Sequence, residues 1–276
     1  MGTSIAELIT DRMDAMPAGE RRAAQTLIAN YPLAGLKTVA DFSHHAGVSS
    51  PTILRFVARL GFHNYAEFQA TLQDELAAQL QSPLSRTGRQ AAPRGDEPAT
   101  LAATLENIRE TFGHVSPRQM DEIVALLADR RASIHLIGGR FTDPIARYMA
   151  AHLSIIRPDV FHLSGQESNW RDRLIDMGRR DVLFVFDIRR YQDSLLQFAE
   201  AAHKRGIQIV LVTDQWLSPI ARFARHVVAG RTAVPSAWDS SAALFVFAEA
   251  LIGDLTRSLE SESAKRIREL ETLRKS

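Results

Sequence analysis

The sequence predicts two domains of different class, an all-α domain at the amino terminus followed by a doubly wound α/β domain. Residues 1–80 carry short amphipathic helical patterns and no strand pattern, and residues 81–98 are rich in Pro, Gly, Ser and Arg. From residue 99 onward helical patterns alternate with short apolar runs, which is typical of a parallel sheet. We therefore expect domains at 1–80 and 99–276, joined by a linker at 81–98.

The composition is that of a globular protein, with 45% hydrophobic and 24% charged residues. The formal net charge of +1 gives no bulk attraction to nucleic acid, so any DNA contact has to come from locally placed Arg and Lys. The chain contains no cysteine, which excludes disulfides, thiolate catalysis and Cys-ligated zinc. Neither a secretory signal nor a bilayer-spanning apolar run is found, and we expect a cytoplasmic protein without membrane contact.

One pair of helices in the first domain has an informative turn, between Thr38 and Leu60. Thr38 can cap the first helix, and Gly47 ends it because a turn there needs positive φ. Ser50 is expected to cap the second helix, with Pro51 at the first helical position, where its missing N–H costs nothing. The pattern predicts a helix-turn-helix, whose second helix enters the major groove of DNA.

Polar residues on the outer face of this pair are candidate DNA contacts. Hydroxyl groups can reach phosphates or base edges, and an arginine can bind guanine bidentately. The predicted DNA-binding residues are Thr38, Ser49, Ser50, Thr52, Arg55 and Arg59. The alternative is an ordinary helical hairpin with solvated arginines. Residues 1–80 contain six Arg and Lys against eight Asp and Glu, so a DNA-binding surface would be a local patch.

Five short apolar runs are the expected strands of the second domain: Ile134–Ile137, Val160–Leu163, Val182–Phe186, Ile207–Thr213 and His226–Val228. The expected helices around them are Asp143–Ile156, Ser168–Met177, Asp193–Lys204, Ser218–Arg225 and Asp239–Leu259. This alternation predicts a flavodoxin-like parallel sheet with helices on both faces. Ligands of such sheets bind at the carboxyl ends of the strands.

The first domain also carries a family resemblance. The segment ERRAAQTLIANYP (20–32) and the string VSSPTILRF…LGF…YAEF (48–68) closely resemble the N-terminal domain of the RpiR/MurR family of bacterial transcriptional regulators. That family carries a sugar-isomerase (SIS) domain after its linker, so the resemblance covers nearly the whole chain. It implies a regulator that binds double-stranded operator DNA and senses a sugar, sugar phosphate or related acidic metabolite. A sugar-phosphate isomerase or another SIS-domain enzyme is the alternative.

The phosphate-binding turns of the family are only partly kept. SIS domains resembling this one commonly use Gly-x-Gly-x-Ser after the first strand and Ser-x-Ser-Gly-x-Thr after a later one, where small residues and hydroxyls cradle a phosphate. The corresponding turns here read GGRFT (138–142) and DIRRYQ (187–192). Asp187 stands where the first serine would be and would repel a phosphate, whereas two arginines could clamp an anion.

Two interpretations of these turns remain open. An altered effector site would use Gly138, Arg140, Thr142, Asp187, Arg189, Arg190, Asp239 and Ser240. An inactive site would have Asp187 and the arginines neutralise each other, and Asp239 and Ser240 fit equally well as helix caps. We expect no catalytic residue, metal or cofactor. Because operators are two-fold symmetric, we expect a homodimer or homotetramer.

Overall fold

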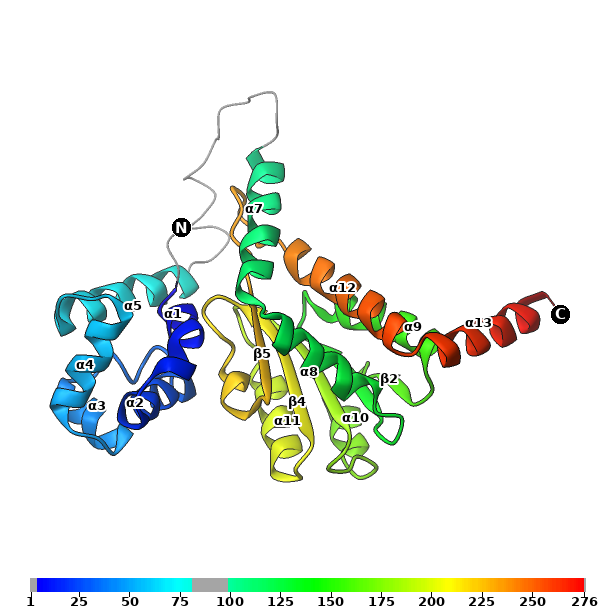
Figure 1. Ribbon diagram of the computed structural model, residues 1–276, viewed down its shortest axis with the longest axis horizontal. Helices are drawn as coiled ribbons and strands as arrows, with labels where there is room; N and C mark the ends of the chain where they lie inside the picture. Colours follow the sequence, from blue (N-terminus) through cyan, green and yellow to red (C-terminus); the bar gives the residue numbers. More distant parts are fainter. Residues whose placement is uncertain (1–3, 81–98, 276) are drawn as a thin grey trace.

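The computed structural model describes residues 4–80 and 99–275, and it divides into a helical domain and an α/β domain (Figure 1). The helical domain contains α1 (Ile5–Arg12), the 3₁₀ helix η1 (Met13–Ala15), α2 (Ala18–Ala29), α3 (Val39–Ala46), α4 (Ser50–Leu60) and α5 (Tyr65–Leu80). The linker expected at 81–98 lies outside the described residues. In the part of the chain that the structure describes, no helix is long and apolar enough to cross a membrane.

The α/β domain is built on five parallel strands in the order β2-β1-β3-β4-β5. The strands are β1 (Ile134–Gly138), β2 (Val160–His162), β3 (Val182–Asp187), β4 (Gln208–Asp214) and β5 (His226–Gly230). The helices are α7 (Ala99–His114), α8 (Pro117–Ala128), α9 (Asp143–Ile156), α10 (Glu167–Arg173), α11 (Asp193–Lys204), η2 (Pro219–Phe223), α12 (Ala242–Ser258) and α13 (Glu260–Lys275). This strand order is that of the flavodoxin-like fold, whose ligand crevice opens between β1 and β3.

Several helices differ from the sequence prediction, and α10 ends at Arg173 instead of Met177. The segment expected to be helical at 218–225 forms only the short η2, after Ser218 accepts a hydrogen bond from the backbone of Ile220. The final helix begins at Ala242, not Asp239, because Asp239 binds another side chain. It is followed by α13, which extends away from the domain on the side opposite to the helical domain (Figure 1).

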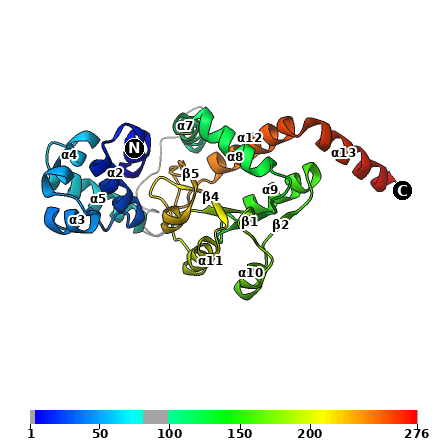
Figure 2. The same ribbon diagram turned by 60° about the horizontal axis from the view of Figure 1, so that its bottom comes forward.

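Two hydrophobic cores cover the two faces of the sheet, since alternate strand residues point to opposite sides. On one face α8, α9 and α12 pack against residues such as Phe184 and Val210. On the other face α10, α11 and η2 pack against residues such as Leu183 and Leu211. Figure 2 shows these two helical layers on either side of the strands. Burial on both faces is the reason why the strands are continuous apolar runs in the sequence.

The helical domain folds around a third core, in which α3 and α4 meet at a tight turn. Gly47 has φ of +61°, the left-handed conformation that ends α3. Phe42 of α3 contacts Phe56 of α4 edge to face, and Phe56 contacts Phe68 of α5 in the same way. Ser49, one residue earlier than expected, is the residue that precedes α4. The turn and the aromatic contacts together fix α4 with its amino-terminal end exposed.

The helical domain contacts the carboxyl edge of the sheet through three of its turns. The hydroxyl of Ser4 donates to the carbonyl of Gln215, after β4, at 2.9 Å. Arg189, after β3, donates to the carbonyl of Ala78 in α5 at 3.0 Å. Arg231, after β5, lies 2.9 Å from the carboxylate of Glu7 in α1. The helical domain therefore contacts the edge where ligands of this fold bind.

The Glu7–Arg231 ion pair is the most buried of these contacts, with side chains 2% and 6% exposed. Glu7 also accepts a hydrogen bond from the backbone of Ser4 and lies 3.0 Å from the Ser4 hydroxyl. Burial raises the pKa of Glu7, and the guanidinium of Arg231 opposes that shift. Arg231 additionally pairs with Glu110 of α7 at 2.8 Å. Because water cannot reach this position, each charge is stabilised mainly by its ion-pair partner.

Replacing Arg231 with Ala should lower the free energy of unfolding by about 3–5 kcal/mol, because Glu7 would become a buried charge without a partner. Arg109→Ala is the control, since the Arg109–Glu106 pair is exposed and spans 3.4 Å. It should cost less than about 1 kcal/mol. Chemical denaturation followed by circular dichroism measures both variants. Equal losses would show that the pair between the domains contributes no more than a surface pair.

Candidate functional site

The amino-terminal end of α4 presents a small polar surface. The hydroxyls of Ser49 and Thr52 lie 2.9 Å apart, and Arg55 Nη2 donates to Thr52 Oγ1 at 3.1 Å. Ser49 and Arg55 are exposed, and Thr52 is half-buried. These three side chains lie together on the outer face of the second helix of the pair, the position from which such a helix reaches a DNA groove.

The other three predicted DNA contacts are engaged within the domain. Thr38 caps α3, accepting from the backbone of Asp41 at 3.1 Å. The hydroxyl of Ser50 lies 3.2 Å from that of Ser43. Arg59 pairs with Glu20 of α2, so its guanidinium joins two helices.

Two exposed basic side chains that were not predicted lie on α3 and just before it. Lys37 and His45 are both exposed, and Lys37 Nζ lies 3.2 Å from His45 Nε2. The sequence did show a lysine just before the first helix and a histidine in its last turn. The two side chains come beside each other only when α3 has folded.

A second candidate site lies where β1 and β3 end side by side. Gly138 of β1 is paired with Phe186 of β3, so the two following turns start next to each other. A Cβ atom on Gly138 would lie 2.4 Å from the backbone nitrogen of Asp143, and only glycine fits there. A cavity of about 260 Å³ opens between these turns, lined by Gly139, Arg140, Phe141, Thr142, Asp187, Ile188, Arg189, Arg190 and Gln192.

A second cavity of about 340 Å³ adjoins the first and shares Gly139, Arg140 and Gln192 with it. Its further lining includes Gly138 and the turn after β2, at residues 164–167. This turn and Gln192 were not predicted as site residues. The sequence signal that could have identified them is their position, directly after a strand and directly before a helix. Ser240 lines neither cavity, and its hydroxyl accepts from the backbone of Ala242 as a cap would.

Arg140 and Arg190 are the two cations of the first cavity that have no acidic partner. Among the described residues neither guanidinium forms an ion pair, and each instead lies over an aromatic ring, Arg140 over Phe141 at 5.3 Å and Arg190 over Trp238 at 6.0 Å. Phe141 and Trp238 contact each other edge to face and remain 48% and 55% exposed. The cavity thus has two available positive charges beside an exposed aromatic pair.

Arg189 is used differently from Arg190. It is buried, binds both carboxylate oxygens of Asp239, and lies 5.1 Å from the ring of Trp216. Its remaining nitrogen donates to Ala78 of the helical domain. Arg190 has φ of +69°, a backbone conformation that sets it apart from its neighbour. Of the adjacent arginines, one joins the domains and the other lines the cavity with its charge unpaired.

Asp187 is buried in the lining of the first cavity and does not pair with either arginine. Its Oδ2 accepts from the hydroxyl of Ser218 at 2.6 Å. Burial, and to a smaller extent the nearby Asp214, raise the pKa of Asp187 to about 7, against the effect of that hydrogen bond. The mutual neutralisation expected of an inactive site is therefore not how these side chains lie.

The hydroxyl of Thr142 is also engaged. It donates to the carbonyl of Phe186 at 2.6 Å and accepts from the backbone of Gly139 at 2.9 Å. Since a hydroxyl has one proton, Thr142 has none left to donate to a ligand.

Two family models match the chain. Residues 3–79 match the helix-turn-helix domain of the rpiR family, and residues 126–253 match the SIS domain. The chain is also similar to the HTH-type transcriptional regulator HexR of Pseudomonas aeruginosa, with 26% identity over 221 residues, 79% of this chain and 76% of that protein.

Two solved structures share the fold. The sugar isomerase domain of an RpiR transcription factor from Sphaerobacter thermophilus superposes with a TM-score of 0.59 and 20% identity, covering 63% of this chain and 96% of that one. The Vibrio vulnificus NanR protein, complexed with ManNAc-6P, has a TM-score of 0.55 and 16% identity over 98% of both chains. The predicted fold class, a helical domain followed by a SIS-type α/β domain, is confirmed.

Asp187 should make the stability of the fold depend on pH. Because its pKa in the folded protein is raised to about 7, the folded state favours the protonated form. The resulting stabilisation is fully present below about pH 4 and is lost as the pH rises through about 7, by up to about 1.4 kcal/mol per pH unit. Asp187→Asn should lack this loss. Urea unfolding of both proteins between pH 4 and 8 measures it, and parallel pH curves would contradict the burial of a titrating Asp187.

Proposed function

The chain belongs to the rpiR family of helix-turn-helix transcriptional regulators with a SIS domain, and we propose that an acidic sugar derivative bound between the turns after β1 and β3 controls its binding to operator DNA. The observation that carries this proposal is that Arg140 and Arg190, at the cavity, form no ion pair with any residue that the structure describes. Guanidinium groups bind carboxylates and phosphates bidentately. The exposed ring of Trp238 offers a surface on which a sugar can stack.

In this proposal the charge of arginine takes the role that hydroxyls have in the phosphate turns of the family. The Thr142 and Ser218 hydroxyls donate within the protein, to Phe186 and Asp187. Arg140 stands at the second glycine of the first turn pattern, and Arg190 lies in the second turn. The ManNAc-6P complex of NanR supports a phosphorylated sugar as one member of the ligand class. Two cations also suit a sugar acid.

Arg189 provides a route from the cavity to the helical domain. It lines the cavity, and it donates to Ala78 at the end of α5. A ligand that moves the turn after β3 would change this contact and with it the placement of the helical domain. Coupling of this kind requires that the ligand bind one arrangement of the turn more tightly than the other.

We propose that Ser49, Thr52 and Arg55 contact operator DNA. Their position at the amino-terminal end of α4 supports this, as does their exposure. The involvement of Arg59 in the pair with Glu20 argues for a supporting role of that residue. We also propose that the protein acts in the cytoplasm as a dimer or tetramer. A two-fold symmetric oligomer matches two-fold symmetric operator DNA.

A catalytic function is not part of the proposal. An aldose–ketose isomerase needs a general base beside a firmly held phosphate. Glu167 lines the second cavity but is exposed, and Glu249 bonds to Tyr148 on the outer surface. The attached DNA-binding domain and the regulator relatives favour sensing over turnover.

The two adjacent arginines should behave oppositely when replaced. Arg190→Ala should remove the response of DNA binding to the effector and leave DNA binding without effector unchanged. Arg189→Ala should lower stability and change DNA binding even without effector, because Asp239 and Ala78 lose their partner. Arg205→Ala, an exposed arginine at the opposite edge of the sheet, is the matched control.

A thermal-shift screen of phosphosugars, sugar acids and polyols identifies the effector. A ligand at a hundredfold excess over its dissociation constant should stabilise the protein by about 2.7 kcal/mol. Fluorescence anisotropy with operator DNA then compares these three variants and Arg140→Ala. An effector response that survives in both Arg140→Ala and Arg190→Ala would remove the basis for placing the site here.

Arg55→Ala should weaken DNA binding by about 1–3 kcal/mol and relax the preference at one base position, because a bidentate contact with guanine would be lost. Arg22→Ala removes the same charge from the exposed face of α2 and should have little effect. Gel shifts against a set of single-base operator variants measure both. Equal affinities of Arg55→Ala and the parent would contradict the assignment of α4 as recognition helix.

A further inference from the structure

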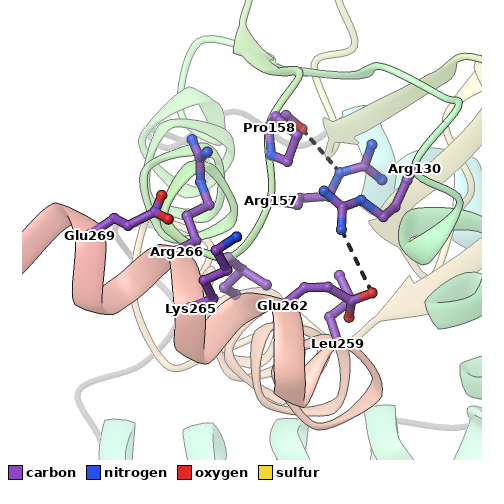
Figure 3. Close-up of a pocket in the computed structure, with 9 residues that line it drawn as sticks. Arg130, Arg157, Pro158, Leu259, Glu262, Lys265, Arg266 and Glu269 are labelled. Atoms are coloured by element: carbon purple, nitrogen blue, oxygen red, sulfur yellow. Dashed lines mark hydrogen bonds and ion pairs between the residues drawn. The ribbon is translucent and has the colours of Figure 1, made fainter.

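A cavity of about 320 Å³ lies at the amino-terminal edge of the sheet, opposite the edge that carries the effector cavity. It is enclosed by α13 and by two loops, the one before β1 with Arg130 and the one before β2 with Arg157 and Pro158. Figure 3 shows the side chains of α13 and of both loops around the same opening. Nothing in the proposed function uses this cavity.

The charged lining of this cavity is mostly positive. Four cations, Arg130, Arg157, Lys265 and Arg266, stand against the two carboxylates Glu262 and Glu269. Arg130 lies 3.6 Å from Glu262 across the opening, and both side chains are about half exposed, at 53% and 48%, so the pair is weak. Among the described residues no ion pair forms at Lys265. Arg266 donates only to the carbonyl of Ser154, at 3.1 Å.

The buried charge of Arg157 makes this excess of positive charge energetically unfavourable. Arg157 is 2% exposed, and its guanidinium donates only to backbone carbonyls, those of Leu127, Asp129, Ala132 and Pro158. The carbonyls satisfy four hydrogen bonds but supply no counter-charge. The carboxylate of Asp129 is bound to Arg131, and that of Asp159 acts only at longer range. A buried cation without an acidic partner favours the binding of an anion beside it.

We propose that this cavity binds a small phosphorylated metabolite, independently of the effector cavity. Arg130, Arg157, Lys265 and Arg266 supply the positive charge, and the planar guanidinium groups of Arg130 and Arg266 match the geometry of phosphate oxygens. The volume exceeds that of an inorganic phosphate, and Ile156 and Leu259 give an apolar wall for the organic part. The anion takes the place of Glu262 at Arg130. Because residues of α13 and residues of the two loops both bind the anion, the anion joins α13 to the body of the domain.

The test uses the full chain with Arg140→Ala and Arg190→Ala, which silences the effector cavity, and pyrophosphate as the probe. Isothermal titration calorimetry should detect binding in this background. Lys265→Gln should weaken it by roughly tenfold or more, the loss expected for one charge-assisted hydrogen bond. Lys265 is exposed, so the variant folds. Lys275→Gln, at the far end of the same helix, should bind as the parent does.

Hydrogen exchange provides the second measurement. Pyrophosphate should slow amide exchange in α13 in the parent and in Lys275→Gln, and should not do so in Lys265→Gln. Binding that is unaffected by Lys265→Gln, or the absence of binding at millimolar pyrophosphate, would overturn the proposal. Equal weakening by Lys265→Gln and Lys275→Gln would also overturn it, because that result reflects general attraction to a basic helix.

Discussion

The buried guanidinium of Arg189 is a contact between the two halves of the chain on which the position of the turn after β3 depends. It joins the turn after β3, the approach to α12 through Asp239, and the end of α5 through Ala78. A buried cation keeps such partners because losing one leaves a charge without compensation. The position of the turn and the position of the helical domain are thereby linked.

The turns at the carboxyl edge of the sheet have two roles, contact with the helical domain and formation of the cavities. The turns after β4 and β5 hold the helical domain through Gln215 and Arg231, whereas the turns after β1 and β2 surround the cavities. The turn after β3 takes part in both. In flavodoxin-like sheets this turn flanks the crevice where the strand order reverses. The cavities and the contact between the domains meet at this turn.

The elements of the fold could be predicted because their signals are local. Apolar runs marked the strands to within two residues, and Gly47 with the Ser-Pro start of α4 marked the helix-turn-helix. The roles of site residues could not be predicted in the same way. Arg189 binds a carboxylate 50 positions away and Arg59 one 39 positions away, and both had appeared available for ligands. Pairing across such distances depends on the fold, which the pattern of residues in one turn does not contain.

The burial of the Glu7–Arg231 pair has a consequence for how the regulator responds to ionic strength. Dissolved ions screen exposed charges over about 8–10 Å, but they reach a pair that is 2% and 6% exposed far less. The exposed basic side chains beside α4 are fully subject to that screening, and phosphate contacts weaken steeply as salt is added. Added salt should therefore weaken the binding of the protein to DNA without separating the two domains. A salt titration then reports the phosphate contacts alone.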